Sequence, residues 1–286
     1  SRFTNSLVYD GGICKRLFNK DKTKYGLLPL NKGSNSETSH IFVNGFMSDE
    51  KEDYKAIDWQ NGLEKFISST DKKFIYKWES SFDYSKLKNH IPFKNGFKHE
   101  IKKFKHLLPL GVSLSTVARL NPFMILPTSF SSFCLEEWKI SKENSVKYGI
   151  SLAEEINTQK ISNDKIYLYA HSLGVNLVKN TLLELGKQNI FVEKVFLFGG
   201  ASCIKNENEW LNVCNLTKKG VYNFYTKNDS ILKYIYRTVE LGSTPIGLVP
   251  LGLKNHKLYN KDVSHTVKGH FEYKKNLQTI FEKLEL

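Results

Sequence analysis

Residues 170–174 (Ala-His-Ser-Leu-Gly) contain the side chain best suited to nucleophilic chemistry. They follow the apolar run 165–170 and precede a stretch whose apolar residues recur at helical spacing. A serine in a sharp strand-to-helix turn, called a nucleophile elbow, needs small residues two positions before and after it. Ala170 stands where glycine is usual, and Gly174 fills the other position. The pattern predicts that Ser172 is a nucleophile.

A serine hydroxyl needs a base that takes its proton, and the base needs an acid that orients it. In proteins built around a nucleophile elbow, the acid and then a histidine follow the serine along the chain. Asp229 follows an apolar run and His270 precedes the last helical segment, so we expect these to be the acid and the base. The alternatives are Glu240 or Asp262 for the acid, and His265 for the base.

The negatively charged oxygen that forms during attack on a carbonyl must be stabilised by backbone amides. We expect the amide of Leu173, directly after the serine, to be one donor. The second is expected from Phe46, in the glycine turn 44–47 that follows an early strand, with Met47 as the alternative. His171 is adjacent to the nucleophile, but a sharp elbow points its side chain elsewhere, so we expect a structural role for it.

Short apolar runs alternate with longer amphipathic segments along most of the chain. This alternation is typical of an α/β fold with a mostly parallel sheet and helices on both faces. The expected strands are 40–44, 73–78, 165–170, 195–198 and 221–225, and the expected helices are 53–69, 175–185 and 271–286. Functional groups in such sheets gather beyond the carboxyl ends of the strands.

The alternation is interrupted over residues 80–136, which we expect to form a helical lid inserted in a single domain, 1–286. Residues 1–39 are polar and are expected to form a peripheral arm. Within the lid, 86–106 is a basic amphipathic segment that would suit an anionic membrane surface. Packing on the core and lying at a membrane interface both stay open. No apolar run reaches the roughly 20 residues that a membrane span needs.

The composition excludes several classes of protein. Among 286 residues, 40% are apolar, which is enough to bury a core and argues against disorder. The net charge is +13, but most basic residues are lysines spread along the chain, so nucleic-acid binding is not expected. The four cysteines have no metal-site spacing, and no cofactor or metal is expected. The sequence indicates neither the cellular location of the protein nor its oligomeric state.

Taken together, these segments resemble the α/β-hydrolase superfamily, and more narrowly a lipase-like family that includes the transmembrane and coiled-coil domain-containing hydrolases. The resemblance runs from about residue 40 to residue 281. The segments that carry it are 43–46 (Val-Asn-Gly-Phe), 77–79 (Lys-Trp-Glu), 170–174, 197–201 (Leu-Phe-Gly-Gly-Ala), 225–229 (Tyr-Thr-Lys-Asn-Asp) and 269–273 (Gly-His-Phe-Glu-Tyr). It implies an α/β-hydrolase fold, a Ser172–His270–Asp229 triad and a lipid-like ester as substrate.

The leading hypothesis is therefore a serine hydrolase that cleaves carboxylic esters of lipids, as a lipase or phospholipase does, through an acyl-enzyme. A second hypothesis is a catalytically idle α/β-hydrolase fold that serves as a membrane adaptor. A third is a thioesterase or peptidase with the same triad, because the triad does not select the acyl group. The apolar loop 242–253 is expected either to line an acyl pocket or to pack on the core.

Overall fold

The computed structural model describes residues 25–32, 34–46, 56–80, 128–205 and 207–284. Three predicted features lie wholly or partly outside this part of the chain: the basic segment 86–106, residues 81–127 of the lid expected over 80–136, and residues 1–24 of the arm expected over 1–39. The lid and its contact with membranes therefore stay predictions.

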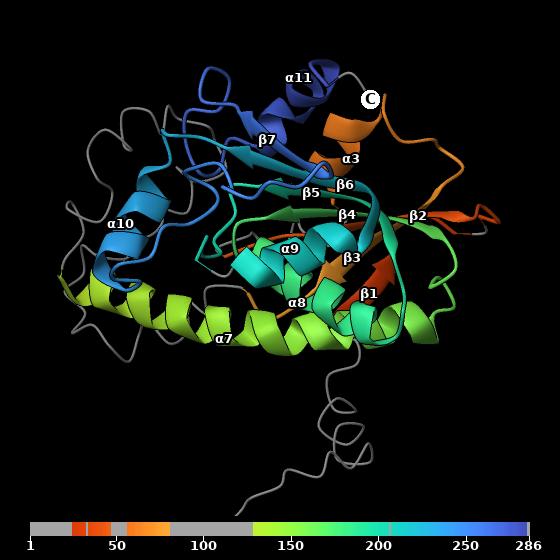
Figure 1. Cartoon of the computed structure of the whole chain (residues 1–286), viewed down its shortest axis with the longest axis horizontal. Coiled ribbons are helices and arrows are strands. Elements are labelled where there is room, and N and C mark those ends of the chain that lie inside the picture. Colours follow the sequence, from red (N-terminus) through yellow and green to blue (C-terminus); the bar gives the residue numbers. More distant parts are fainter. Residues whose placement is uncertain (1–24, 33, 47–55, 81–127, 206, 285–286) are drawn as a thin grey trace, which may run out of the picture.

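A seven-stranded sheet forms the centre of the described part (Figure 1). In sheet order the strands are β1 (Gly26–Pro29), β3 (Lys72–Lys77), β2 (Thr38–Val43), β4 (Lys165–His171), β5 (Val192–Phe198), β6 (Thr217–Tyr225) and β7 (Leu258–Asp262). In this sheet β1 pairs antiparallel with β3, and every other pairing is parallel. The prediction of a mostly parallel sheet is confirmed.

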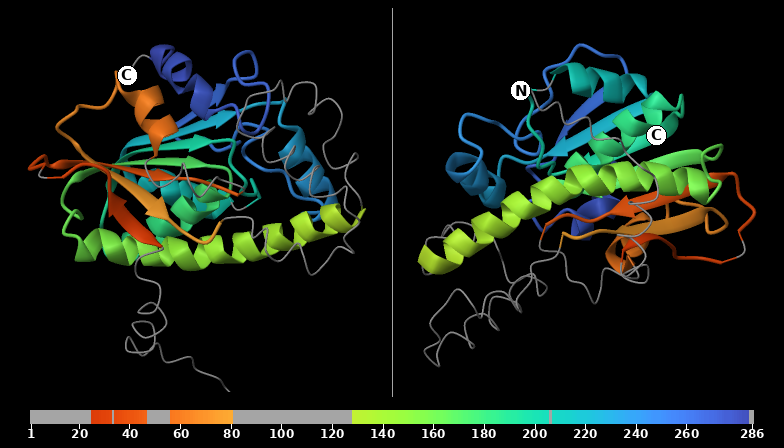
Figure 2. Two further views of the ribbon diagram at one scale, coloured as in Figure 1. Left: turned by 180° about the vertical axis from the view of Figure 1, so that it is seen from behind. Right: turned by 90° about the horizontal axis from the view of Figure 1, so that it is seen from below.

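Helices cover both faces of the sheet (Figures 1 and 2). On one face lie α7 (Thr128–Thr158), α8 (Leu173–Lys187) and α9 (Glu207–Asn215), and on the other lie α3 (Ile57–Leu63), the short 3-10 helix η1 (Lys274–Asn276) and α11 (Leu277–Glu282). The remaining helix of the described part, α10 (Ser230–Thr238), follows β6 and lies near the first turns of α7 (Figure 2).

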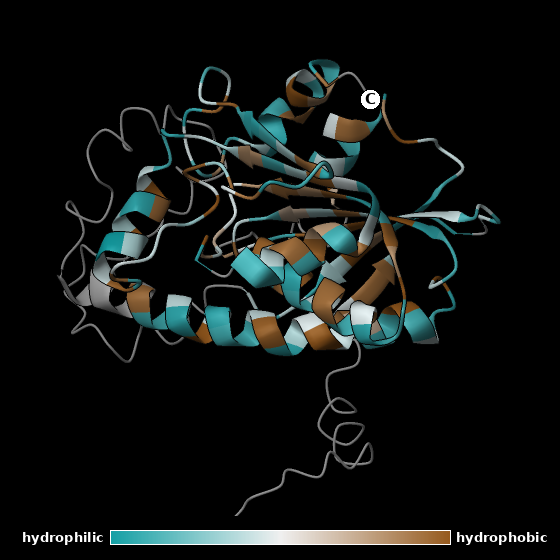
Figure 3. Cartoon of the chain, viewed as in Figure 1, coloured by the Kyte–Doolittle hydropathy of each residue, from teal (hydrophilic) through white to brown (hydrophobic). Residues whose placement is uncertain are grey.

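Two apolar clusters hold the layers together. The cluster between the sheet and α7 and α8 is rich in aliphatic side chains, whereas the opposite cluster is mostly aromatic. In the aromatic cluster the rings of Phe198 and Phe224, on neighbouring strands, stack with centroids 4.8 Å apart. Most residues of β4, β5 and β6 are buried, and Figure 3 shows brown, apolar stretches along the central strands between the helices. Burial on both faces explains why these strands could be predicted from short apolar runs in the sequence.

The loop 242–253 packs on the ends of the central strands. Ile246 is fully buried, and the amide of Gly247 donates to the carbonyl oxygen of Gly200 at 2.9 Å. Of the two expectations for this loop, packing on the core is confirmed for its middle residues.

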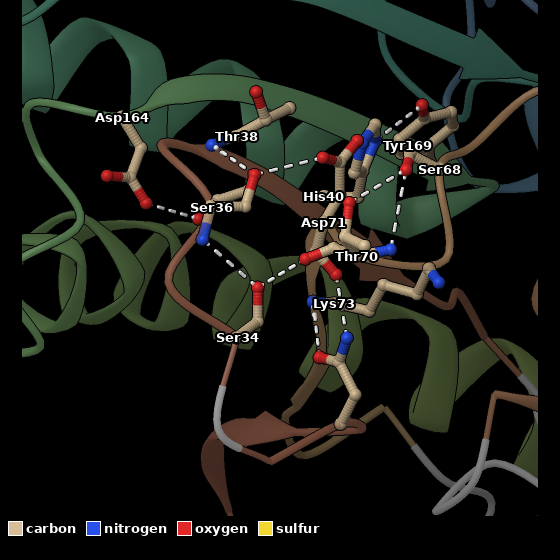
Figure 4. Close-up of polar contacts among 12 residues, drawn as sticks. Ser34, Ser36, Thr38, His40, Ser68, Thr70, Asp71, Lys73, Asp164 and Tyr169 are labelled. Carbon is tan, nitrogen blue, oxygen red and sulfur yellow. Dashed lines mark hydrogen bonds and ion pairs between the residues drawn. The ribbon is translucent and has the colours of Figure 1, made fainter.

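A buried histidine lies at the amino ends of the parallel strands (Figure 4). His40 is 4% exposed, and its Nε2 lies 2.9 Å from Asp71 Oδ2 while its Nδ1 lies 2.9 Å from the hydroxyl of Tyr169. Since a carboxylate only accepts, Nε2 carries the hydrogen and Nδ1 accepts from Tyr169. Ser36 donates to the other carboxylate oxygen at 2.9 Å. The network is complete with a neutral imidazole, and burial lowers the pKa of His40.

We expect the free energy of unfolding to fall as the pH drops below about 6.5. In the unfolded chain His40 has its ordinary pKa, and in the folded chain this pKa is lower, so the unfolded state binds more protons in this range. His171, whose pKa burial lowers well below the ordinary value, acts in the same direction. His40→Gln keeps a donor to Asp71 but does not titrate. Urea unfolding between about pH 7 and pH 5 should show a smaller loss for this variant. Equal losses for the two proteins would contradict the assignment.

Candidate active site

Ser172 stands in a strained turn between a strand and a helix. It follows the last residue of β4, His171, and precedes the first residue of α8, Leu173, and its backbone has φ 58° and ψ −124°. A non-glycine residue with positive φ costs of order 1–3 kcal/mol and persists only where its surroundings fix it. Here the Ser172 amide donates to the Phe198 carbonyl at 3.1 Å, and the Ser172 carbonyl accepts from Ala201 at 3.0 Å. The geometry matches the predicted nucleophile elbow, residues 170–174.

Two glycines allow neighbouring backbone to approach the elbow. A Cβ added at Gly45 would lie 2.4 Å from the Cβ of Ser172 and 2.5 Å from the carbonyl oxygen of His171. A Cβ added at Gly174 would lie 2.7 Å from the carbonyl oxygen of Asn44. These distances are too short for real carbon atoms, so both positions require glycine. The segment after β2 is thus pressed against the elbow.

Asp229 and His270 meet Ser172 beyond the carboxyl ends of the strands. His270 Nδ1 lies 2.5 Å from Asp229 Oδ2, and His270 Nε2 lies 2.8 Å from the hydroxyl oxygen of Ser172. All three residues are buried, with 0% exposure for the serine and the aspartate and 4% for the histidine. Because the carboxylate only accepts, Nδ1 carries the hydrogen and Nε2 accepts from the hydroxyl. The arrangement can withdraw a proton from Ser172.

The aspartate is oriented by the helix that follows it. Asp229 is the N-cap of α10, and its Oδ1 accepts a hydrogen bond of 2.8 Å from the amide of Leu232. This leaves Oδ2 for His270. The short connection between β6 and α10, which makes Asp229 the N-cap, therefore determines which carboxylate oxygen faces the imidazole.

Two tryptophans hold the segment after β2 over the elbow. The indole of Trp59 donates to Asn44 Oδ1 at 2.7 Å, and the indole of Trp78 donates to the Asn44 carbonyl at 2.8 Å. All three residues are buried. These contacts fix the path of the chain into Gly45.

The two expected oxyanion donors lie on the segments that these contacts bring together. A Cβ on Gly45 would be 3.0 Å from the amide nitrogen of Leu173, so the segment that leads into Phe46 lies beside that amide. The Phe46 ring is buried against Trp138, with centroids 5.4 Å apart. The donor roles of Phe46 and Leu173 stay predictions, and Met47 lies outside the described residues.

The alternatives for acid and base lie elsewhere. His265 is exposed. Asp262 is also exposed and pairs with Lys227 at 3.3 Å. Glu240 forms an ion pair of 2.6 Å with Lys142 on α7. None of these three lies in the hydrogen-bonded chain that contains Ser172.

Within the described ranges, no three His, Cys, Asp or Glu side chains are grouped so as to hold a metal ion. The same residues include no helix that combines the length and the apolarity needed to cross a membrane.

The fold and the site define a class of protein. A mostly parallel sheet with helices on both faces, a serine in a strained turn after a central strand, and an aspartate and a histidine after later strands are the features of the α/β-hydrolase fold. A model of the family described as proteins of unknown function, DUF726, matches residues 17–286. The chain belongs to this family.

Several curated relatives match most of the chain. An uncharacterized membrane protein of Caenorhabditis elegans is 25% identical over 262 residues, covering 90% of this chain and 41% of the relative. An uncharacterized membrane protein of Schizosaccharomyces pombe is 28% identical over 271 residues, covering 89% and 43%. A transmembrane and coiled-coil domain-containing protein, STS1, of rice (Oryza sativa subsp. japonica) is 24% identical over 253 residues, covering 86% and 36%. The chain spans about two fifths of the length of these relatives.

Solved structures with a similar arrangement are distant in sequence. MenH from S. aureus is 10% identical, with a TM-score of 0.42 and coverage of 91% of this chain and 97% of that chain. An esterase of Pyrococcus furiosus is 12% identical, with a TM-score of 0.37 and coverage of 87% and 79%.

Proposed function

We propose that this protein is a serine hydrolase that cleaves carboxylic esters of lipids through an acyl-enzyme intermediate. The observation that supports this most strongly is the buried hydrogen-bonded chain from Ser172 through His270 to Asp229. The strained backbone of Ser172 is a second, independent support, because such strain gathers at functional sites.

In the proposed reaction the hydroxyl oxygen of Ser172 bonds to the ester carbonyl carbon while His270 Nε2 takes the hydroxyl proton. The carbonyl electron pair moves to its oxygen, where the amides of Leu173 and Phe46 stabilise the negative charge. When the carbonyl re-forms, the bond to the alkoxy oxygen breaks, and His270 returns the proton to the departing alcohol. A water molecule then repeats these steps on the acyl-enzyme and releases the carboxylic acid.

Asp229 acts through His270 in this scheme. Its carboxylate holds the imidazole with the hydrogen on Nδ1, so that Nε2 faces Ser172 as an acceptor. It also stabilises the positive charge that the imidazole gains on accepting the proton.

A lipid-like acyl group is supported by the apolar rings near the elbow. Phe46 packs on Trp138, and Trp138 packs on Tyr236 of α10 with centroids 6.5 Å apart. All three side chains are buried. The basic segment 86–106 is proposed to bring the protein to an anionic membrane surface, and the membrane proteins among its relatives support this peripheral association.

Acyl esters of increasing chain length, with a thioester and an anilide of the same acyl group, test this proposal. The purified protein should hydrolyse the oxygen esters and react with a fluorophosphonate probe. Each methylene that becomes buried contributes about 0.8 kcal/mol, so kcat/KM should rise about fourfold per methylene for as long as added methylenes are buried on binding.

Phospholipid vesicles followed by mass spectrometry of the released acids would then identify the natural ester. Faster cleavage of the thioester or the anilide would favour the corresponding alternative class. No reaction with any ester and no labelling by the probe would reject the proposal.

A further inference from the structure

A second histidine lies beside the site, and the proposed reaction does not use it. His171 is the last residue of β4 and is 5% exposed. Its Nε2 lies 2.7 Å from the backbone carbonyl oxygen of His270, and the two imidazole centroids are 4.9 Å apart. His171, which directly precedes Ser172, therefore contacts the backbone of His270, and the imidazole of His270 in turn contacts Ser172.

The hydrogen-bond partner fixes the protonation of His171. A carbonyl oxygen only accepts, so Nε2 carries a hydrogen and donates it. Burial lowers the pKa of His171 well below its usual range, and the nearby His270 and Lys274 lower it further. The neutral form with its hydrogen on Nε2 is thus the form that makes this contact.

The loop that carries His270 is tied to the sheet at its beginning by other contacts. The hydroxyl of Thr226 donates to the Val267 carbonyl at 2.8 Å, and Asn228 donates to the Ser264 carbonyl at 2.8 Å. At Gly269, a Cβ would meet nothing within 4 Å, and the Gly269 carbonyl oxygen accepts from the amide of Glu272 at 3.2 Å. The bond from His171 then holds the peptide of His270 itself.

We infer that His171 is a positioning residue, which holds the backbone of His270 at the distance from Ser172 that proton transfer requires. This inference rests on the proposed function, in which His270 is the base. Because His171 and Ser172 are consecutive, one rigid dipeptide positions both ends of the contact of 2.8 Å between the hydroxyl and His270 Nε2. A neutral His171 also adds no repulsion to the positive charge that His270 gains during the reaction.

Two variants of equal side-chain length separate the hydrogen bond from simple packing. Glutamine places an N–H group near the position of the histidine Nε2, whereas methionine fills a similar volume without a donor. We expect His171→Gln to keep kcat within about threefold of wild type. His171→Met should lower kcat and the rate of fluorophosphonate labelling by about 10- to 100-fold with little change in KM. Melting temperatures of both variants show whether each one is folded.

A proton resonance gives a readout that does not depend on turnover. The Nδ1 hydrogen that His270 shares with Asp229 should give a downfield signal in histidine-labelled protein. We expect this signal in wild type and in His171→Gln, and we expect its loss or broadening in His171→Met. If His171→Met does not fold, His171→Asn, whose amide is one methylene too short, serves as the variant without the bond.

The outcomes separate this inference from the proposed function. If wild type labels and the methionine variant labels equally fast and keeps the resonance, His171 does not position His270. If wild type does not label, the proposed function fails, and the resonance alone still decides whether His171 holds the imidazole in place.

Discussion

Ser172→Ala is expected to abolish labelling by the fluorophosphonate probe and to lower kcat for ester hydrolysis by about 10⁶-fold. The Ser172 hydroxyl oxygen is the atom that bonds to the acyl carbon in the proposed reaction, and its partner, His270 Nε2, lies 2.8 Å away. Alanine removes this one buried atom. The folded state then loses a single hydrogen bond, at a cost of about 1–3 kcal/mol, so the variant should remain folded. Intact-protein mass spectrometry measures the labelling, and thermal unfolding measures the stability.

A second buried serine offers a matched control for this experiment. Ser202 is 3% exposed, lies in the loop after β5, and donates its hydroxyl to Asn176 Oδ1 at 3.1 Å. Ser202→Ala removes the same atom and a comparable hydrogen bond without touching His270. This variant should label and turn over as wild type does. Equal labelling of Ser172→Ala and wild type would show that another residue reacts with the probe.

The central strands were predictable from sequence because they are buried on both faces. β2, β3, β4, β5 and β6 begin or end within a few residues of the expected runs. The edge strands were not found. β7 has the sequence Leu-Tyr-Asn-Lys-Asp and is half-buried or exposed along its length, so it has no apolar run. β1, which lies inside the expected arm, is a strand because β3 supplies its hydrogen bonds.

The helices were predicted less well than the strands. α7, at 31 residues, was not identified, and its first turns fell inside the expected lid. Its buried side chains, such as Trp138, Tyr148 and Leu152, are separated by charged and polar residues, because one side of the helix packs on α8 and the other is exposed. The final helix was predicted over 271–286, but α11 covers only Leu277–Glu282 after η1.

The approach of Ser172, Asp229 and His270 was predictable, although 98 residues separate the serine from the histidine. An elbow is a local pattern, and parallel strands bring their carboxyl ends to one edge of the sheet, so chain order was enough. The contact from His171 to the His270 carbonyl was not predictable. It depends on the path of a loop 99 residues away, and no pattern around either residue encodes that path. The contact between the side chains of His40 and Asp71 was not predictable either, because no pattern around these residues indicates that they pair.

Asp229→Asn is expected to lower kcat by about 10⁴-fold while the protein remains folded. The asparagine Oδ1 still accepts from the Leu232 amide, so the cap of α10 is preserved. The amide nitrogen that replaces Oδ2 is a donor and faces His270 Nδ1, which is now favoured as an acceptor. The imidazole hydrogen then moves to Nε2, and the histidine loses its acceptor for the Ser172 proton. Steady-state kinetics at fixed pH measure this loss.

Two further variants distinguish the role of the Asp229 carboxylate beside His270 from its role as the N-cap of α10 and from the effect of removing any negative charge. Asp229→Ala removes both functions and should add a loss of about 1 kcal/mol of stability to the same loss of activity. Asp262→Asn removes an exposed carboxylate that pairs with Lys227 and should behave as wild type. The cap of α10 needs only an oxygen acceptor, whereas the imidazole needs a carboxylate. Asp229→Asn should therefore lose activity and keep its stability, and Asp229→Ala should lose both. An asparagine variant with the kcat of wild type would mean that His270 does not require the charge beside it, and the proposed acid would be wrong.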